Sequence, residues 1–167
     1  MKFSALETLL FSLFLPLIAA HAQQQPQSAQ PSLSLTISVP GTAVKAGSPL
    51  KLKITTTNTS DHDVSYLVST DGLYDVYVHD AAGALAPETP EGARKHFWSP
   101  NHRPEVGSVF VARYHLEARA RQEIEVDITK EYHLTKPGKY TVYVERPDPE
   151  NKGKQIKSNT ITITVMP

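Results

Sequence analysis

The chain has 167 residues, with 17 basic and 17 acidic side chains and a formal net charge of zero at pH 7. Binding to nucleic acid or to anionic lipid depends on clustered positive charge, so this balance argues against both classes of partner. The chain contains no cysteine. Its fold is therefore expected to depend on a hydrophobic core alone, without disulfides and without a lipid on an N-terminal cysteine.

Residues 1–22 have the three parts of a cleavable signal peptide. Lys2 lies near the start, an apolar run of ten residues extends from Leu9 to Ile18, and the small-residue triplet Ala20–Ala22 follows. A helix that crosses a bilayer needs about 20 apolar residues, so this run is too short for a permanent anchor. We predict cleavage after Ala22 and a secreted or periplasmic protein that is not inserted in the membrane.

Residues 23–31 (QQQPQSAQP) contain only glutamine, proline, serine and alanine. Such a polar stretch has nothing to bury, and we predict a disordered spacer. Residues 32–167 remain, and their number suits a single domain.

From Leu33 onward, apolar and polar residues alternate with period two, which is the pattern of strands that bury one face. About eight strands are expected. They lie around residues 33–39, 50–54, 64–68, 74–78, 109–116, 124–128, 140–144 and 161–165. Ile156 is one residue out of phase with Ile161 and Ile163, which predicts a bulge near Ser158. No window has convincing helical periodicity, so the chain is predicted to be all-β.

The segment around Tyr140 indicates the kind of sandwich. Pro137 and Gly138 predict a tight turn, and Tyr140 opens a strand that continues with Val142 and Val144 on the same face. In immunoglobulin-like sandwiches, a tyrosine at the start of strand F donates its hydroxyl to nearby backbone, two residues before the second antibody cysteine. We therefore predict an immunoglobulin-like antiparallel β-sandwich of about seven to nine strands with Greek-key connections, in which Pro137, Gly138 and Tyr140 form a structural corner.

Residues 116–144 (LEARARQEIEVDITKEYHLTKPGKYTVYV) and the closing KSNTITITV resemble the C-terminal half of uncharacterised secreted bacterial proteins with an immunoglobulin-like sandwich. The fold is also distantly similar to that of the intracellular proteinase inhibitor family of bacilli. Residues 118–121 (ARAR) stand where such domains usually have a Pro-Gly turn. The resemblance covers roughly the last third of the chain and implies a fold and a compartment, but no catalytic or binding residue.

The alternation stops between Asp80 and Val106, a proline-rich stretch of about 27 residues that is expected to form one long loop. The candidate ligand-binding residues in this loop are Phe97, Trp98, His102 and Arg103. Tryptophan and arginine are enriched at the energetic centres of interfaces. The alternative is that Trp98 plugs an open end of the core, with Phe97 beside it.

No catalytic motif accompanies these features. A Gly-x-Ser-x-Gly elbow, a phosphate-binding loop and a dinucleotide motif are all absent, so we expect a protein that is not an enzyme and uses no cofactor. Asp61-His62-Asp63, or His96 with His102, could contribute to a loop metal site. Solvated polar groups are the alternative, and no metal site is predicted.

Asn58-Thr59-Ser60 matches the acceptor pattern for N-glycosylation. The alternative is a polar turn between two strands, which the bacterial character of the signal peptide favours.

The predicted function is that of an exported, non-catalytic binding module of unknown ligand. Its partner would be a protein or polysaccharide in the cell envelope or outside the cell, bound by loops at one end of the sandwich or by strand addition at an exposed edge. Three alternatives stay open: a proteinase inhibitor that presents residues 80–106, a metal- or carbohydrate-associated protein, and a structural domain of the envelope without a dedicated ligand.

Overall fold

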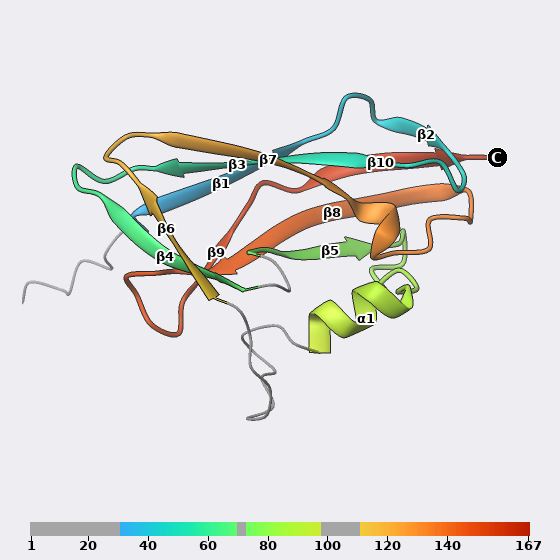
Figure 1. Cartoon of the computed structure of the whole chain (residues 1–167). Helices are drawn as coiled ribbons and strands as arrows, with labels where there is room; N and C mark the ends of the chain where they lie inside the picture. The colour runs from blue at the N-terminus through green and yellow to red at the C-terminus, as the bar shows by residue number, and fades with distance from the viewer. Residues whose placement is uncertain (1–30, 70–72, 98–110) are drawn as a thin grey trace, which may run out of the picture.

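The computed structural model describes residues 31–69, 73–97 and 111–167. These residues form an all-β, immunoglobulin-like sandwich, as the alternation predicted, with two main sheets on opposite sides of one hydrophobic core (Figure 1). The predicted signal peptide (1–22) and the predicted spacer up to residue 30 lie outside the described residues. In the part of the chain that is described, no helix has the length and apolar character needed to cross a bilayer.

The sandwich consists of ten strands in three groups. The first sheet has the order β1-β3-β7, formed by Leu33–Ser38, Lys51–Asn58 and Arg121–Asp127. The second has the order β2-β10-β8-β5, formed by Ala43–Lys45, Ile161–Met166, Gly138–Pro147 and Asp75–His79, and β9 (Gln155–Lys157) pairs with the end of β8. β4 (Val64–Ser69) and β6 (Val111–Leu116) form a separate ribbon. All pairs are antiparallel except β2 with β10.

The core is built from alternate residues of both sheets. Its fully buried aliphatic residues include Leu52, Ile54, Val64, Val78, Val142, Val144 and Ile163. Each such side chain stabilises the folded state by about 1.5–3 kcal/mol relative to exposure. A core of this extent is consistent with a chain that has no disulfide to restrict its unfolded state.

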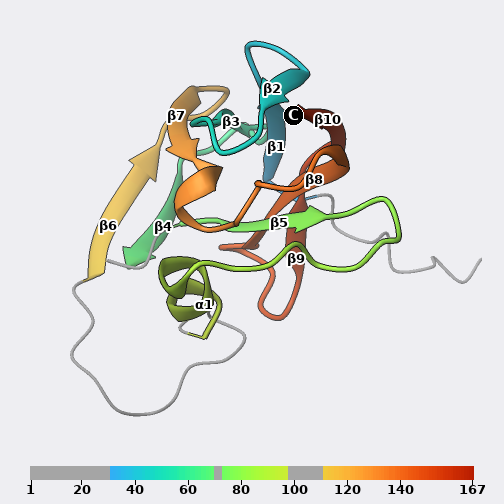
Figure 2. The ribbon, with the colours of Figure 1, turned by 90° about the vertical axis from the view of Figure 1, so that its right-hand side faces the viewer.

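A short helix lies inside the stretch that the sequence predicted to be one long loop. α1 (Pro90–Phe97) corrects that prediction over the first part of residues 80–106 (Figures 1 and 2). Thr89 caps the helix, because its Oγ1 accepts the backbone N–H of Gly92 at 3.1 Å. Pro90 occupies the first helical position, where its fixed φ is favourable. Two turns are too few for apolar periodicity to show, so only the cap could have revealed the helix.

β9 and β10 are separated by an inserted residue, at the place where the sequence indicated a bulge. Lys157 lies opposite Glu145, whereas Ile161 lies opposite Val142, so four steps along this segment match three steps along β8. Ser158 fills the gap, since it both donates its N–H to Val144 O and accepts the Val144 N–H on its hydroxyl, each at 2.9 Å. The insertion brings the apolar residues of both strands to the same core.

The β3–β7 pair and the β4–β6 pair form one long ribbon with a bend (Figure 1). Asn58 holds the bend, and its side chain is fully buried. Its Nδ2 donates to the carbonyls of His62 (2.8 Å), Leu116 (3.0 Å) and Glu117 (3.0 Å), and its Oδ1 accepts the N–H (3.0 Å) and hydroxyl (2.7 Å) of Ser60. The folded chain therefore uses this amide as a structural group and does not expose it for glycosylation.

The turn that joins β6 to β7 explains a departure from the resemblance. Arg119 has a φ of 64°, the left-handed region in which a Pro-Gly turn would place its glycine. Ala118 donates its backbone N–H to Asp63 Oδ1 at 3.0 Å, a bond that proline could not make. The Arg119 guanidinium donates to the Thr59 carbonyl at 2.6 Å. Residues of the facing bend thus fix a turn that lacks both proline and glycine.

Candidate functional site

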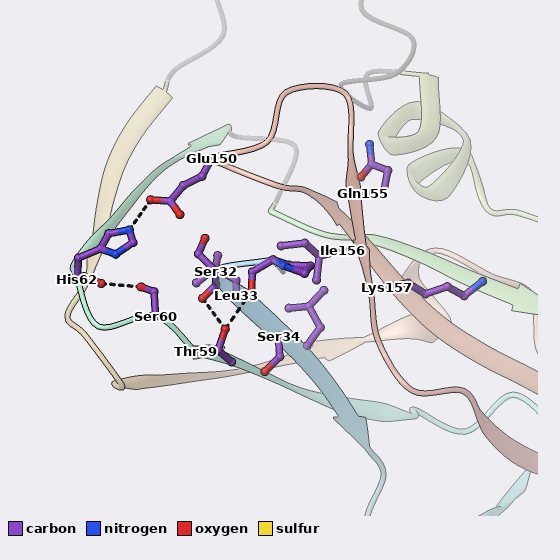
Figure 3. Close-up of a pocket in the computed structure, with 12 residues that line it drawn as sticks. Ser32, Leu33, Ser34, Thr59, Ser60, His62, Glu150, Gln155, Ile156 and Lys157 are labelled. Atoms are coloured by element: carbon purple, nitrogen blue, oxygen red, sulfur yellow. Dashed lines mark hydrogen bonds and ion pairs between the residues drawn. The ribbon is translucent and has the colours of Figure 1, made fainter. Parts of the chain in front are cut away.

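A cleft lies at the edge of the sandwich where β1 begins, and we call it the edge cleft (Figure 3). Its volume is about 560 Å³. Four segments line it: residues 31–35 at the start of β1; Thr59, Ser60 and His62 in the bend after β3; Glu150 in the turn after β8; and residues 155–157 of β9. The edge cleft therefore lies between the free edge of the first sheet and the short end strand of the second.

The backbone of β1 presents open hydrogen-bonding groups to this cleft. Ser32 O accepts the N–H of Thr59 at 2.7 Å, so the backbone groups of Ser32 face β3. In an antiparallel pair, residues whose backbone groups bond to the partner strand alternate with residues whose N–H and C=O groups point away from it. The N–H and C=O groups of Leu33 and Leu35 therefore point away from β3. Neither residue has a further hydrogen-bond partner among the described residues. Two successive positions of a strand edge are thus open, about 6.7 Å apart along β1.

Asn159 closes the edge of β1 one step further along. Its Oδ1 accepts the N–H of Ile37 at 2.7 Å, and its Nδ2 donates to the Ile37 carbonyl at 3.1 Å. An asparagine amide thereby replaces the peptide group of a neighbouring strand. The open part of the edge ends at this residue.

Two other sheet edges are protected. On β5, Val76 O accepts the Tyr132 hydroxyl at 2.6 Å and Val78 O accepts the Ala86 N–H at 2.8 Å, so the side of β5 that faces α1 is covered (Figure 2). β7 carries Glu123 and Glu125 on its outer face. Charged side chains are a common protection against the pairing of edges. β1, by contrast, has only serine, threonine and apolar residues.

The wall of the edge cleft is polar and its floor is apolar. The Ser32 hydroxyl is buried, and it helps to lower the pKa of the Glu150 carboxyl group that also lines the cleft. The Thr59 hydroxyl donates to the backbone carbonyl of Ser32 at 3.0 Å. Leu33, Leu35 and Ile156 line the floor and are almost fully buried. The cleft can therefore hydrogen-bond to a polar backbone, while apolar contact is confined to its floor.

An ion pair closes the end of the cleft near the start of β1. His62 Nε2 lies 2.8 Å from Glu150 Oε1 (Figure 3). His62 Nδ1 also lies 3.4 Å from Asp61 Oδ1. Glu150 is the main cause of a raised pKa at His62, and His62 in turn lowers the pKa of both carboxyl groups. All three side chains are substantially exposed, so solvent screens the interaction.

No protein-family model matches the chain, and no curated protein matches it. Among solved structures, it is similar to a DNA glycosylase AlkC of Pseudomonas fluorescens, with 15% identity and a TM-score of 0.43, over 82% of this chain and 31% of that one. It is also similar to a CARDB domain from Pyrococcus furiosus, with 12% identity and a TM-score of 0.43, over 81% of this chain and 95% of that one. It is similar as well to a PapD-like domain of human CEP192, with 17% identity and a TM-score of 0.32, over 90% of this chain and 94% of that one. These similarities assign neither a family nor a function.

The ligand-binding residues predicted from the sequence fall at the end of the described segment or beyond it. Phe97 is the last residue of α1, and Trp98, His102 and Arg103 lie outside the described residues. The described part of the predicted loop is attached to the body of the sandwich. Lys95 Nζ lies 2.5 Å from Glu131 Oε1, for example, and this part is not a free, extended loop.

Two of the histidines considered for a metal site have other partners, and the third, His102, lies outside the described residues. His96 pairs with Glu88 and stacks on Tyr77 with ring centroids 5.6 Å apart. His62 is held by Glu150, as described above. Within the described ranges, no group of three or more histidine, aspartate or glutamate side chains could hold a metal ion.

Sequence reasoning named an exposed edge strand as one possible binding mode but did not locate it. The available signals were the absence of charge in residues 33–38 and the polar pair Ser158-Asn159 before the last strand. Neither indicates by itself which strand lies at an edge, because that depends on the order of strands in the sheet.

Proposed function

We propose that the chain is a non-catalytic binding module that accepts an extended segment of another protein as an additional strand on β1. The open N–H and C=O groups of Leu33 and Leu35 in the edge cleft are the observation that carries this proposal. Main-chain bonding at a sheet edge supplies affinity, and neighbouring side chains supply selectivity. With the export predicted from residues 1–22, the partner would be a protein of the cell envelope or of the exterior.

The hydrogen-bonding pattern favours a polypeptide over a small molecule or a sugar. A donor and an acceptor on Leu33 recur on Leu35 at the repeat of a strand, which is the spacing that another extended backbone matches. The cleft is bounded by Asn159 at one end and by the His62–Glu150 pair at the other. The added strand can therefore pair with β1 over only about four residues.

The short pairing region implies weak binding. Four backbone hydrogen bonds at about 1 kcal/mol each give about 4 kcal/mol, which corresponds to a Kd in the millimolar range. Burial of an apolar side chain against the floor formed by Leu33, Leu35 and Ile156 would be needed for tighter binding. We therefore propose a transient interaction with segments that alternate apolar and polar residues.

A proteinase inhibitor that uses residues 80–106 has less support. An inhibitory loop has to enter a protease cleft in extended form, whereas residues 90–97 are helical and Gly92 packs directly on the backbone of Glu131. This geometry leaves only the latter part of that stretch, outside the described residues, for such a role.

The proposal is tested by selecting random octapeptides displayed on phage against the purified chain. Selected peptides are then synthesised and titrated into ¹⁵N-labelled protein. We expect the backbone amide resonances of Leu33 and Leu35 to shift and to become protected from hydrogen exchange on binding. Perturbation confined to α1, or unperturbed Leu33 and Leu35 amides at millimolar concentrations of peptides that alternate apolar and polar residues, would contradict strand addition on β1.

Two matched variants separate an edge effect from a general effect of charge. Ser34→Lys places a positive charge on β1, whereas Thr57→Lys places it on β3 at the position directly opposite Ser34. Both lie on the same face of the sheet, but only Ser34 lines the cleft. We expect Ser34→Lys to weaken peptide binding and Thr57→Lys to leave it nearly unchanged.

A further inference from the structure

The ion pair at the end of the edge cleft connects two parts of the fold that are far apart in sequence. His62 belongs to the bend between β3 and β4, and Glu150 belongs to the turn between β8 and β9. Both side chains line the cleft, and the dashed contact in Figure 3 joins them across its end. The pair thereby connects the turn of the second sheet to the bend of the first.

Strand addition on β1 requires this connection to give way. β9 lies beside β1, with Cα atoms within 8 Å of each other. An added strand would lie about 4.8 Å from β1 on the side where β9 now lies. The β8–β9 turn therefore has to move outward, and a contact that holds this turn against the bend opposes that movement.

We propose that His62 and Glu150 form a pH-dependent latch on the edge cleft, closed when His62 is protonated and loosened when it is neutral. This inference rests on the proposed function for its purpose, because the latch would control access of the extended segment to β1. Protonated imidazole attracts the carboxylate by charge, whereas the neutral ring retains only a hydrogen bond.

The other charged groups near the latch do not reverse the direction of its pH dependence. Asp61 also attracts protonated His62, at 3.4 Å, but it belongs to the same bend and does not connect the two sheets. Arg119 lies in the neighbouring turn and is attached to the Thr59 carbonyl, where its charge acts on Asp61. Asp63, in the bend before β4, pairs with His115 at 3.0 Å, and its negative charge also favours protonated His62.

Asp148, in the same turn as Glu150, is the remaining carboxyl group near the latch. It is buried and accepts the backbone N–H groups of Glu150 (3.0 Å) and Asn151 (3.2 Å). These bonds keep the turn rigid, so Glu150 moves with the turn as a unit. A loosened latch would therefore displace the β8–β9 turn rather than the glutamate side chain alone.

The exposure of the two side chains to solvent limits how strongly pH can shift the latch. The side chains of His62 and Glu150 are 56% and 37% exposed, so the pair resembles a surface ion pair. Such pairs change an equilibrium by about two- to fivefold. The latch is thus expected to shift the population of the open cleft by that factor between pH 5.5 and pH 8.

The absence of cysteine allows a direct test, because two introduced cysteines can be spin-labelled without side reactions. Glu117→Cys places one label in the β6–β7 turn that faces the bend, and Lys152→Cys places the other in the β8–β9 turn, both at exposed positions. Electron–electron distance measurements are made at pH 5.5 and at pH 8. We expect a larger fraction of long distances at pH 8.

Two further variants identify the cause of any change. Glu150→Gln removes the charge of the latch, and the distances should then no longer depend on pH. Glu145→Gln serves as the matched control, because Glu145 is on the same hairpin but pairs with Lys157 at 3.6 Å. The control should keep the pH dependence of the unsubstituted chain. Equal distances at the two pH values, or an unaltered pH dependence in Glu150→Gln, would overturn the latch.

The same proteins separate this inference from the proposed function. A distance change with pH that depends on Glu150 supports the latch even where millimolar peptide leaves the Leu33 and Leu35 amides unperturbed, an outcome that rejects only strand addition. Peptide binding at Leu33 and Leu35 with pH-independent distances rejects only the latch.

Discussion

The hydroxyl of Tyr140 donates a hydrogen bond of 2.9 Å to the backbone carbonyl of Lys136. Tyr140 is nearly buried at the start of β8, and Lys136 lies four residues earlier, before Pro137 and Gly138. This bond fastens the entry of the central strand of the second sheet. It has the form of the tyrosine corner of immunoglobulin-like sandwiches.

Tyr140→Phe should lower the free energy of unfolding by about 1 kcal/mol, because it removes one buried hydrogen bond and leaves the ring in place. Urea denaturation followed by far-ultraviolet circular dichroism measures this change. Tyr143→Phe is the control, since the Tyr143 hydroxyl makes no hydrogen bond to another described residue. Equal losses in the two variants would show that the corner bond has no special role.

Asn58→Ala should be among the most destabilising single substitutions. It leaves three carbonyl groups and Ser60 without their partner in a buried bend, and the expected loss is about 3 kcal/mol of unfolding free energy. Asn151→Ala, in the β8–β9 turn, is the comparison. It removes a single side-chain bond to Asp148 at 2.9 Å and should cost less than about 1 kcal/mol.

Gly92→Ala tests how closely α1 packs. A methyl group on Gly92 would overlap the carbonyl oxygen of Glu131, so the helix has to shift. We expect a loss of about 1–3 kcal/mol, despite the higher helix propensity of alanine. Gly41→Ala introduces the same methyl group where no atom lies within 4 Å, and it should be neutral or slightly stabilising. Thermal denaturation of the two variants side by side decides this.

The pKa of His62 should lie above its ordinary value of 6.5, chiefly because of the hydrogen bond to Glu150. The stability that this pair contributes is then fully present below pH 6.5 and is lost as the pH rises through the raised pKa. An NMR titration of the imidazole resonances measures the pKa. Glu150→Gln should lower it, whereas Glu117→Gln should not, and an unchanged value in Glu150→Gln would contradict the assignment of its cause.

Amide hydrogen exchange in the free protein should alternate along β1. The amides of Ser34 and Thr36 point to β3 and should exchange slowly, whereas those of Leu33 and Leu35 should exchange fast. The Ile37 amide, held by Asn159, should be slow. In Asn159→Ala it should become as fast as that of Leu35, and slow exchange of Leu33 and Leu35 would show that the edge is already occupied.

The alternation of apolar and polar residues predicted eight of the strands and the kind of fold, because a half-buried strand shows its inner face directly in the sequence. The alternation predicted that β3 ends earlier than it does in the structure. Thr56 and Asn58 occupy inward positions there and are fully buried, with Thr56 Oγ1 lying 2.5 Å from the Tyr74 hydroxyl. Polar residues that satisfy each other inside the core interrupt the pattern without interrupting the strand.

Three elements had too few residues to give a periodic signal. β2 (Ala43–Lys45) and β9 (Gln155–Lys157) have three residues each, and α1 has two turns. Arg146 is a different case. It occupies an inward position of β8 and is 2% exposed, with its guanidinium carbon 4.2 Å from the centre of the Tyr66 ring. A single sequence does not show that an aromatic ring from another strand will cover a buried cation.

The edge cleft could not be predicted because it depends on which strands are neighbours. The sequence suggests that residues 33–38 form a strand with one apolar face, but both edges of that strand look alike until its partners are known. Only the order β1-β3-β7 shows that one edge stays open. The location of the site therefore depends on pairings between residues that are distant in sequence.

The parallel pairing of β2 with β10 has a consequence for folding during synthesis. Ala43 lies opposite Thr164, so almost the whole described chain separates the two partners. A nascent chain that has not yet released β10 from the ribosome can form the bent ribbon, but it cannot seat β2 or complete the second sheet. Pairings of such long range are slow to form. The protein is thus expected to stay sensitive to proteases until β10 is free to pair and to acquire resistance in a single late step.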